Sequence, residues 1–350
     1  MKKRKIINII SGKGGTGKTL FAAILADLLG NQGSNILVID LDIFVRGLTA
    51  LLYFHKGESI NIVEKDEVTV SDFFIEPNVK YLNKKLALYR YRSFDVLPSV
   101  PRIDSVFNLT DLVPDNREKA ISILKSLLSS IEDKYDYIFL DSRAGYDELI
   151  SATYLISDIS ICVQEEDEIS NVTANNLVRQ LEKDSNNSVF RVINKARYIR
   201  KYEDIYSNKG FGLNYLGSIP FDIDVMNSFG KATFWEDIYR TFYRSAVAEV
   251  WNTLSKKMGF DEKIYVKRIS PIGTNKLEKK LSSISIMNRV LFFYGIVLTF
   301  GGLIYFIFGP SIENVLCIIN KDPSRLLALL ISLLGLLMSI FSILRKQKLK

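Results

Sequence analysis

Cysteine and histidine are scarce in this chain, which contains two cysteines and one histidine among 350 residues. Cys162 lies in an apolar segment far along the chain from Cys317, so neither a disulfide framework nor a cysteine-bound metal cluster is expected, and the pattern suits a reducing cytoplasm. The single histidine, His55, stands beside Lys56 and Gly57 and is expected on a solvated loop rather than at a catalytic centre.

Internal repeats, low-complexity tracts and the apolar core of a signal peptide are also missing. The first residues, Met-Lys-Lys-Arg-Lys, run directly into an apolar segment, so no cleaved leader is expected. A chain of this length can hold one α/β domain of ordinary size together with an appendage.

Acidic charge is depleted at one end of the chain. Residues 263–350 contain 13 lysines and arginines against 3 aspartates and glutamates, which leaves 33 and 36 for residues 1–262. The net charge is therefore +10 for the C-terminal segment and −3 for the rest. The overall charge of +7 at first suggests a nucleic-acid-binding protein, but the basic residues belong to a hydrophobic segment, which argues against nucleic acid as a partner.

The strongest motif is the octapeptide at residues 12–19, Gly-Lys-Gly-Gly-Thr-Gly-Lys-Thr, which matches the phosphate-loop pattern G-x-x-x-x-G-K-[ST]. Residues 5–10 predict a buried parallel strand and residues 20–29 a helix, which is the context such a loop requires. Inward-pointing backbone N–H groups and the helix N-terminus would attract phosphate. Lys18 can reach the β- and γ-phosphates, and the Thr19 hydroxyl can hold Mg²⁺. The expected nucleotide-binding residues here are Gly12, Gly14, Gly15, Thr16, Gly17, Lys18 and Thr19.

A second lysine, Lys13, follows the first glycine of the loop. The sequence Lys-Gly-Gly-Thr-Gly-Lys-Thr resembles the deviant Walker A signature of the MinD/ParA family of ATPases. This resemblance implies an α/β fold with a mostly parallel sheet flanked by helices, ATP and Mg²⁺ as cofactors, and an ATP-dependent homodimer. By resemblance Lys13 crosses to the phosphates of the partner subunit, Lys18 acts within its own subunit, and Thr19 is a magnesium ligand.

Two further strands are predicted to end in carboxylates, at residues 35–42 and 135–141, and ligands of open parallel sheets gather at such strand ends. By resemblance to the family, Asp42 acts on the hydrolytic water and Asp40 lies in the magnesium shell. Asp141 has the Walker B arrangement, which suits magnesium binding through water. Residues 43–46 depart from the family pattern, which leaves open how this switch contacts a partner.

Arg143 is a second departure, because the chain reads Ser-Arg-Ala-Gly after Asp141 where family members often have Ser/Thr-Pro. The segment resembles a variant Asp-Ser-Arg-x-Gly of MinD-like ATPases from bacterial conflict systems. Contact with phosphate, contact with a partner subunit, and a solvated surface position all remain open for Arg143.

Later segments extend the resemblance to about residue 255. Residues 158–164 and 189–194 predict strands, and Asn194 resembles the family's base-contacting asparagine. Pro220 and Asp222 belong to a Gly-x-Ile-Pro-x-Asp element that lies beside adenine in the family. Helices are predicted over 69–74, 115–132 and 245–254, and a core strand over 94–98. The basic and aromatic segment 80–92 favours an edge hairpin with a solvated face over a nucleic-acid surface.

Residues 290–308 and 326–344 each form an uncharged stretch of 19 residues. As helices they would be about 29 Å long, close to the ~30 Å hydrocarbon core of a bilayer, and they predict an α-helical transmembrane hairpin. Basic residues flank the pair on its outer sides, which places both chain ends in the cytoplasm by the positive-inside rule. We therefore expect an ATPase domain at 1–258, a charged juxtamembrane linker at 259–289, the hairpin within 290–344, and a basic cytoplasmic tail at 345–350.

These features predict an ATPase anchored in the inner (cytoplasmic) membrane that uses ATP-dependent homodimerisation to recruit, position or regulate an unidentified protein partner. Two full spans make the anchor permanent, so ATP would control pairing within the membrane plane rather than membrane attachment. Three alternatives were considered: an ATPase or effector of an antiphage or conflict system, a DNA-partitioning ParA-like protein, and a membrane-attached tyrosine kinase. The acidic ATPase part disfavours DNA partitioning, and the basic, tyrosine-free tail disfavours the kinase.

Overall fold

The computed structural model describes residues 4–43, 47–56, 67–75, 85–99, 114–183, 185, 187–197, 214–228, 231, 233–239 and 241–266. All of them belong to the first of two compact units, which comprise residues 1–270 and 271–350. The predicted spans and the basic tail lie outside the described residues. Within the described ranges, no helix has both the length and the apolar character needed to cross a bilayer.

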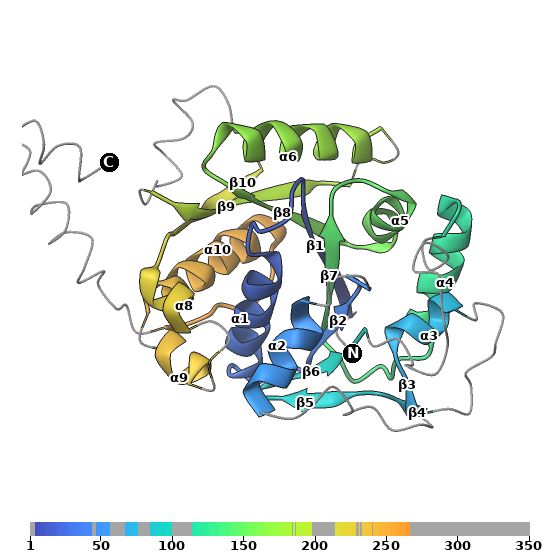
Figure 1. The fold of residues 1–350 in the computed structure, drawn as a ribbon, viewed down its shortest axis with the longest axis horizontal. Coiled ribbons are helices and arrows are strands. Elements are labelled where there is room, and N and C mark those ends of the chain that lie inside the picture. The colour runs from blue at the N-terminus through green and yellow to red at the C-terminus, as the bar shows by residue number, and fades with distance from the viewer. Residues whose placement is uncertain are drawn as a thin grey trace, which may run out of the picture. The chain divides into compact units, whose positions relative to one another are not determined.

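An eight-stranded sheet forms the centre of the first unit (Figure 1). Its strands are parallel apart from β5, which runs antiparallel to β6 at one edge. In spatial order the strands are β10 (Tyr215–Pro220), β9 (Val189–Ala196), β8 (Ile159–Glu165), β1 (Lys5–Ser11), β7 (Tyr137–Ala144), β2 (Ile36–Asp40), β6 (Phe94–Leu97) and β5 (Tyr89–Tyr91). The predicted mostly parallel sheet is confirmed, and β1 with its phosphate loop lies between β8 and β7.

Both faces of the central strands are buried, which explains their nearly continuous apolar sequences. Along β2, Val38 packs into the core on one face, while Leu37 and Ile39 pack into the core on the other. Phe139 and Leu140 of β7 divide between the two faces in the same way. Alternation with a period of two thus places successive apolar side chains of these strands in opposite cores.

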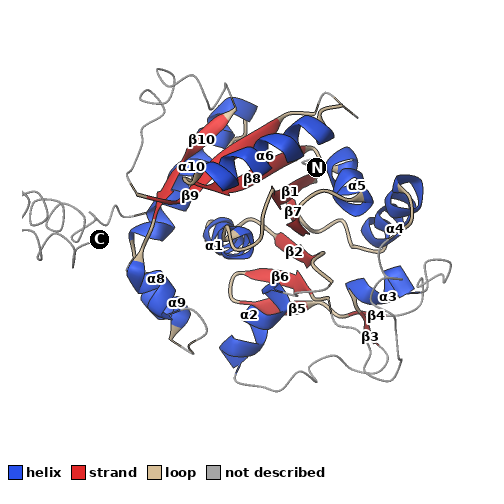
Figure 2. Cartoon of the chain, turned by 45° about the horizontal axis from the view of Figure 1, so that its top comes forward, coloured by secondary structure: helices blue, strands red, loops and turns tan. Residues whose placement is uncertain are grey.

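Helices cover the two faces of the sheet, and Figure 2 shows α1 on one side of the central strands with α4 and α5 on the other. The first face carries α1 (Lys18–Gly30), α2 (Gly47–Lys56), α8 (Ile223–Ser228), α9 (Phe234–Ile238) and α10 (Phe242–Met258). The second carries α3 (Val70–Ile75), α4 (Arg117–Ser129), α5 (Glu148–Ile156) and α6 (Glu168–Leu181). This three-layer arrangement sets the phosphate loop at the C-terminal edge of the sheet, where α1 begins.

Aspartate side chains start the two helices that follow the central strands. Asp147 accepts a hydrogen bond from the N–H of Ile150 at the start of α5, and Asp167 accepts one from the N–H of Ser170 at the start of α6, both at 2.8 Å. N-capping of this kind satisfies a free helix N–H group and favours the ionised carboxylate. Both caps therefore fix a negative charge beside the C-terminal edge of the sheet.

Residues 85–92 of the segment predicted as an edge hairpin are described, and within them β5 lies at the edge of the sheet and pairs antiparallel with the predicted core strand β6, residues 89–91 with 94–96. A separate short parallel pair joins β3 (Glu67–Val68) to β4 (Lys85–Leu86). Basic residues of this region contact the protein itself: Lys85 pairs with Glu67, Arg90 with Asp95, and Arg92 lies over the Trp235 ring at 5.0 Å. These contacts favour the structural interpretation of the segment over a nucleic-acid surface.

Candidate functional site

The loop between β1 and α1 adopts a backbone that glycine favours at two positions. Gly15 and Gly17 have φ angles of +80° and +87°, in the left-handed region. Gly17 is also the N-cap of α1 and has no side chain to compete with a ligand for the first helix N–H groups. A Cβ added at Gly14 or Gly15 would meet no atom within 4 Å, so both glycines border open space. The loop is therefore shaped to receive an anion.

Two consecutive residues at the end of β9 hold this loop in place. Asn194 Nδ2 donates to the carbonyl oxygen of Thr16 at 2.8 Å, and a Cβ on Gly17 would collide with the same amide nitrogen. Lys195 Nζ donates to the carbonyl oxygen of Gly15 at 2.6 Å. Lys195 has a φ angle of +54°, which is uncommon for a residue with a side chain and is typical of functional sites.

Asp141 has the surroundings expected of a magnesium-binding carboxylate. It is 1% exposed, and neither carboxylate oxygen meets a donor at hydrogen-bonding geometry among the described residues. Burial raises the pKa of Asp141 to about 6, while the charge of Lys18 and the hydroxyl of Thr19 act to lower it. A cation held by Asp141 and Thr19 would satisfy these buried oxygens, so the residues fit the predicted Mg²⁺.

Asp40 lies opposite Asp141 in the register of β2 and β7 and is fully buried. Burial and the charge of Asp141 raise the pKa of Asp40 to about 8. Its oxygens accept hydrogen bonds from Thr49 Oγ1 at 2.6 Å, from Thr49 N at 2.9 Å and from Asp42 N at 3.1 Å. The carboxylate thus fastens the start of α2, a contact that the sequence did not reveal, and its place in the magnesium shell stays a prediction.

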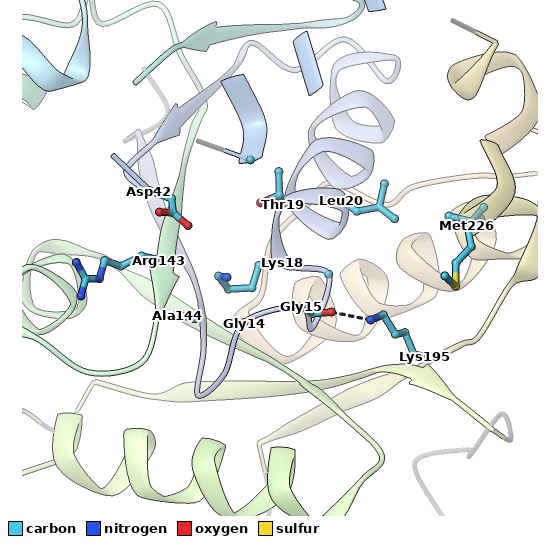
Figure 3. A pocket seen from close by; sticks show the side chains of 13 residues that line it. Gly14, Gly15, Lys18, Thr19, Leu20, Asp42, Arg143, Ala144, Lys195 and Met226 are labelled. Atoms are coloured by element: carbon cyan, nitrogen blue, oxygen red, sulfur yellow. Dashed lines mark hydrogen bonds between the residues drawn. The ribbon is translucent and has the colours of Figure 1, made fainter. Parts of the chain in front are cut away.

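A cavity of about 840 Å³ opens beside the loop at the C-terminal edge of the sheet (Figure 3). Its volume lies within the range of cofactor sites, about 300–1,000 Å³. The predicted residues that line it are Gly14, Gly15, Gly17, Lys18, Thr19 and Asp42. The other lining residues are Leu20, Gly47, Arg143, Ala144, Lys195, Val225 and Met226. The structure therefore gathers the phosphate-binding residues and Asp42 around one space.

Lys13 is not among the residues that line this cavity. Its ammonium forms ion pairs with Glu165 Oε2 at 2.7 Å and with Asp167 Oδ2 at 2.9 Å, in the segment that joins β8 to α6. Hydrogen bonds to Glu165 and then to Asp167 raise the pKa of Lys13, which keeps the lysine charged. Glu165 also accepts from Lys195 Nζ at 2.6 Å. Glu165 therefore links the signature lysine to the lysine that holds the loop.

The residues predicted beside the base are Asn194, Pro220 and Asp222, and they lie at the ends of β9 and β10. Asp222 Oδ1 accepts a hydrogen bond at 3.0 Å from the N–H two residues further on, at the start of α8. Among described residues the cavity wall on this side is formed by Val225 and Met226 of α8, not by the three predicted residues. Base contacts by those three stay a prediction, and the side chains of Asn194 and Asp222 contact the phosphate loop and the start of α8 instead.

Lys195, Glu165 and Asp167 are the functional side chains that sequence analysis missed. Asp167 could have been recognised as the N-cap of a helix, and Lys195 adjoins the predicted Asn194. Nothing in the sequence indicates that Glu165 binds two lysines. The glycine loop, the buried carboxylates and the cavity beside them together define a P-loop nucleotide-binding protein of the α/β class.

Comparisons with known proteins identify the family. A family model described as an AAA domain matches residues 4–192, more than half of the chain, and the chain belongs to this family. An uncharacterized ATP-binding protein of Methanocaldococcus jannaschii is 30% identical over 156 residues, which cover 44% of this chain and 50% of that protein. The septum site-determining protein MinD of Synechocystis sp. is 29% identical over 146 residues, which cover 40% of this chain and 46% of that protein. The chain thus spans about half the length of these curated relatives.

Among solved structures, MinD of Pyrococcus horikoshii complexed with Mg-ADP shares the fold. The TM-score of the match is 0.55 at 22% sequence identity, and the match covers 75% of this chain and 100% of the MinD chain. These similarities support the resemblance to the MinD/ParA family that the phosphate loop predicted. The described part of the chain therefore shares its fold with MinD.

Replacement of Gly17 by alanine tests the loop geometry. An alanine at this position has to adopt the left-handed backbone of Gly17, which costs about 1 kcal/mol. Its Cβ also collides with the side chain of Asn194. We expect an at least tenfold weaker affinity for a labelled ATP analogue. Gly33→Ala is the matched control, because Gly33 has a φ angle of +94° but borders open space away from the cavity. An equal loss of affinity in both variants would contradict the assigned role of the loop.

Proposed function

We propose that the chain is a membrane-anchored ATPase in which ATP pairs two copies, and that the pair recruits, positions or regulates a protein partner. The observation that carries this proposal is the phosphate loop with its second lysine. Lys18 lines the cavity beside the loop, whereas Lys13 lies outside that cavity and is held by carboxylates near its rim. A lysine that does not serve its own cavity is available for the cavity of a facing copy.

ATP hydrolysis in this proposal uses residues of the same edge of the sheet. The loop N–H groups and Lys18 bind and orient the phosphates, and Asp42 positions the attacking water. Bound Mg²⁺ would neutralise phosphate charge from a position held by Thr19 and Asp141. Loss of the terminal phosphate would remove the contacts that hold two copies together, so hydrolysis would end the signal to the partner.

The membrane part of the proposal is carried by the two uncharged 19-residue stretches and their basic flanks. We place the protein in the cytoplasmic membrane, with the ATPase domain and the C-terminus in the cytoplasm. A hairpin of two spans holds far more strongly than an amphipathic helix or a single lipid. Both copies of a pair would then diffuse in one plane, which raises their effective concentration for each other.

A second candidate function is an effector of a conflict system, in which pairing makes the hairpin perturb the bilayer. It is favoured by the Arg143 segment, which resembles the variant of such systems. Dye release from liposomes containing the full chain distinguishes the two. Release that requires ATP and is lost in Lys18→Ala supports the effector, and intact liposomes with ATP contradict it.

Lys13→Ala tests the pairing. We expect the variant to bind ATP within about threefold of wild type yet to remain monomeric with ATP, because only the contact across the pair is removed. Mass photometry of the full chain in nanodiscs, with and without ATP, measures this. Lys134→Ala is the control, since Lys134 pairs with Glu132 on the surface. Formation of ATP-dependent homodimers by the Lys13→Ala variant would contradict the proposal.

The two native cysteines test the membrane orientation. Cys317 lies between the predicted spans, in the expected outer loop, whereas Cys162 is fully buried and its burial raises the thiol pKa to about 11. We expect a membrane-impermeant maleimide to label intact cells at Cys317 only, with Cys317→Ser as the unlabelled control. Labelling that appears only after permeabilisation would reverse the orientation.

A further inference from the structure

Arg143 occupies a position beside the phosphate loop that the proposed function has not used. It lies two residues after Asp141 on β7, the strand that pairs with β1. Ala144 is the register partner of Ser11, and the N–H of Gly145 donates to the carbonyl oxygen of Ser11 at 2.9 Å. These contacts fix the backbone of this segment against the start of the loop, and Arg143 lines the same cavity as Lys18.

The guanidinium of Arg143 is held by the carboxylate of Asp147, whose charge has a second stabilising contact besides Arg143. Arg143 Nε lies 2.8 Å from Asp147 Oδ2, and the two side chains are 28% and 15% exposed. The other oxygen of Asp147 caps α5 through the N–H of Ile150 at 2.8 Å. Because the helix N-terminus already stabilises the charge of Asp147, departure of Arg143 would not leave an uncompensated buried carboxylate.

The distribution of charged residues around the cavity indicates that Arg143 lies at the end of the cavity where the terminal phosphate would bind. Three cations line it, Lys18, Lys195 and Arg143, and Lys195 is bound to Gly15 and Glu165. Figure 3 shows Arg143 on the other side of Lys18 from Lys195 and Met226. Met226 and Val225 form the apolar wall, so Arg143 stands at the end that holds the carboxylates Asp42 and, behind it, Asp141.

We propose that Arg143 is a catalytic residue of ATP hydrolysis in its own subunit, which exchanges Asp147 for the terminal phosphate of bound ATP. This inference rests on the proposed ATPase function. In the reaction, a water oxygen forms a bond to the γ-phosphorus while the bond from phosphorus to the β–γ bridging oxygen breaks, and the electron pair of that bond remains on ADP. The water proton leaves toward Asp42 or solvent. Arg143 transfers no proton; its fork of N–H donors stabilises charge on the phosphate oxygens.

Exchange between a carboxylate and a phosphate suits arginine better than lysine. A planar guanidinium can bind a phosphate through two parallel hydrogen bonds, whereas an ammonium offers a point charge, and Arg143 meets Asp147 through Nε. Asp147 therefore holds Arg143 in an ordered position until a terminal phosphate arrives. ADP lacks that phosphate and leaves the ion pair in place, so Arg143 affects ATP hydrolysis without contributing to ADP affinity.

Four variants of the full chain in nanodiscs test this role by single-turnover ATP hydrolysis, ADP affinity and ATP-dependent pairing. Arg143→Ala is expected to hydrolyse about 10²-fold or more slowly, with ADP affinity and pairing retained. Arg143→Lys should recover only a small part of the rate. Asp147→Asn keeps a good N-cap, so it should fold, bind ADP and hydrolyse at least as fast as wild type. Arg90→Ala, which removes a surface ion pair at the sheet edge, is the control.

A wild-type rate in Arg143→Ala, with pairing intact, overturns the role of Arg143 and leaves the proposed function standing. An equal loss of ADP affinity in that variant also overturns it, because Arg143 would then support the fold. Failure of the wild-type chain to hydrolyse ATP or to pair contradicts the proposed function itself. Mixing Arg143→Ala with Asp42→Ala, each inactive alone, tests whether Arg143 acts in its own subunit or in the partner's. Recovered hydrolysis in the mixture would show that Arg143 acts in the partner's site and would contradict action in its own.

Discussion

Two buried carboxylates opposite each other in the sheet are the constraint on which the site depends. Asp40 and Asp141 are register partners on β2 and β7, and neither is more than 1% exposed. Burial raises the pKa of both carboxyl groups, and the charge of Asp141 raises the pKa of Asp40 further. Lys18 supplies one positive charge, and the Thr49 donors fix Asp40, but within the described residues no donor meets an Asp141 oxygen at full hydrogen-bonding geometry. The fold thus forms a site whose buried carboxylates are stabilised when a cation and a nucleotide bind.

Two cations near this centre, Lys13 and Arg143, are held by acidic side chains that lie at or after the ends of β7 and β8. Lys13 pairs with Glu165 and Asp167, and Arg143 pairs with Asp147. Asp167 and Asp147 also cap α6 and α5, so helix N-termini stabilise the carboxylates that hold these cations. In the proposed cycle, nucleotide phosphates compete with these carboxylates for the same side chains. That competition would connect ATP binding to the surface that a second copy meets.

Much of the architecture could be predicted from the sequence, because buried parallel strands and a phosphate loop have distinctive local patterns. The strands at β1, β2, β6, β7, β8 and β9 were expected within a few residues, as was α1. Contacts between distant segments could not be predicted. Lys13 and Asp167 lie 154 residues apart, and Asn194 and Thr16 lie 178 apart, so only the strand order brings them together. The left-handed backbone at Lys195 has no sequence signal, since favourable residues there would be glycine or asparagine.

In the proposed cycle, ATP transfers Lys13 from carboxylates of its own chain to the phosphates of a second copy. A cryo-electron-microscopy structure of the full chain in nanodiscs with a non-hydrolysable ATP analogue and Mg²⁺ tests it directly. The account predicts two chains face to face, with each Lys13 ammonium on the partner's nucleotide and no longer bound to Glu165 and Asp167. A nucleotide-bound single chain in which Lys13 still contacts both carboxylates would contradict it.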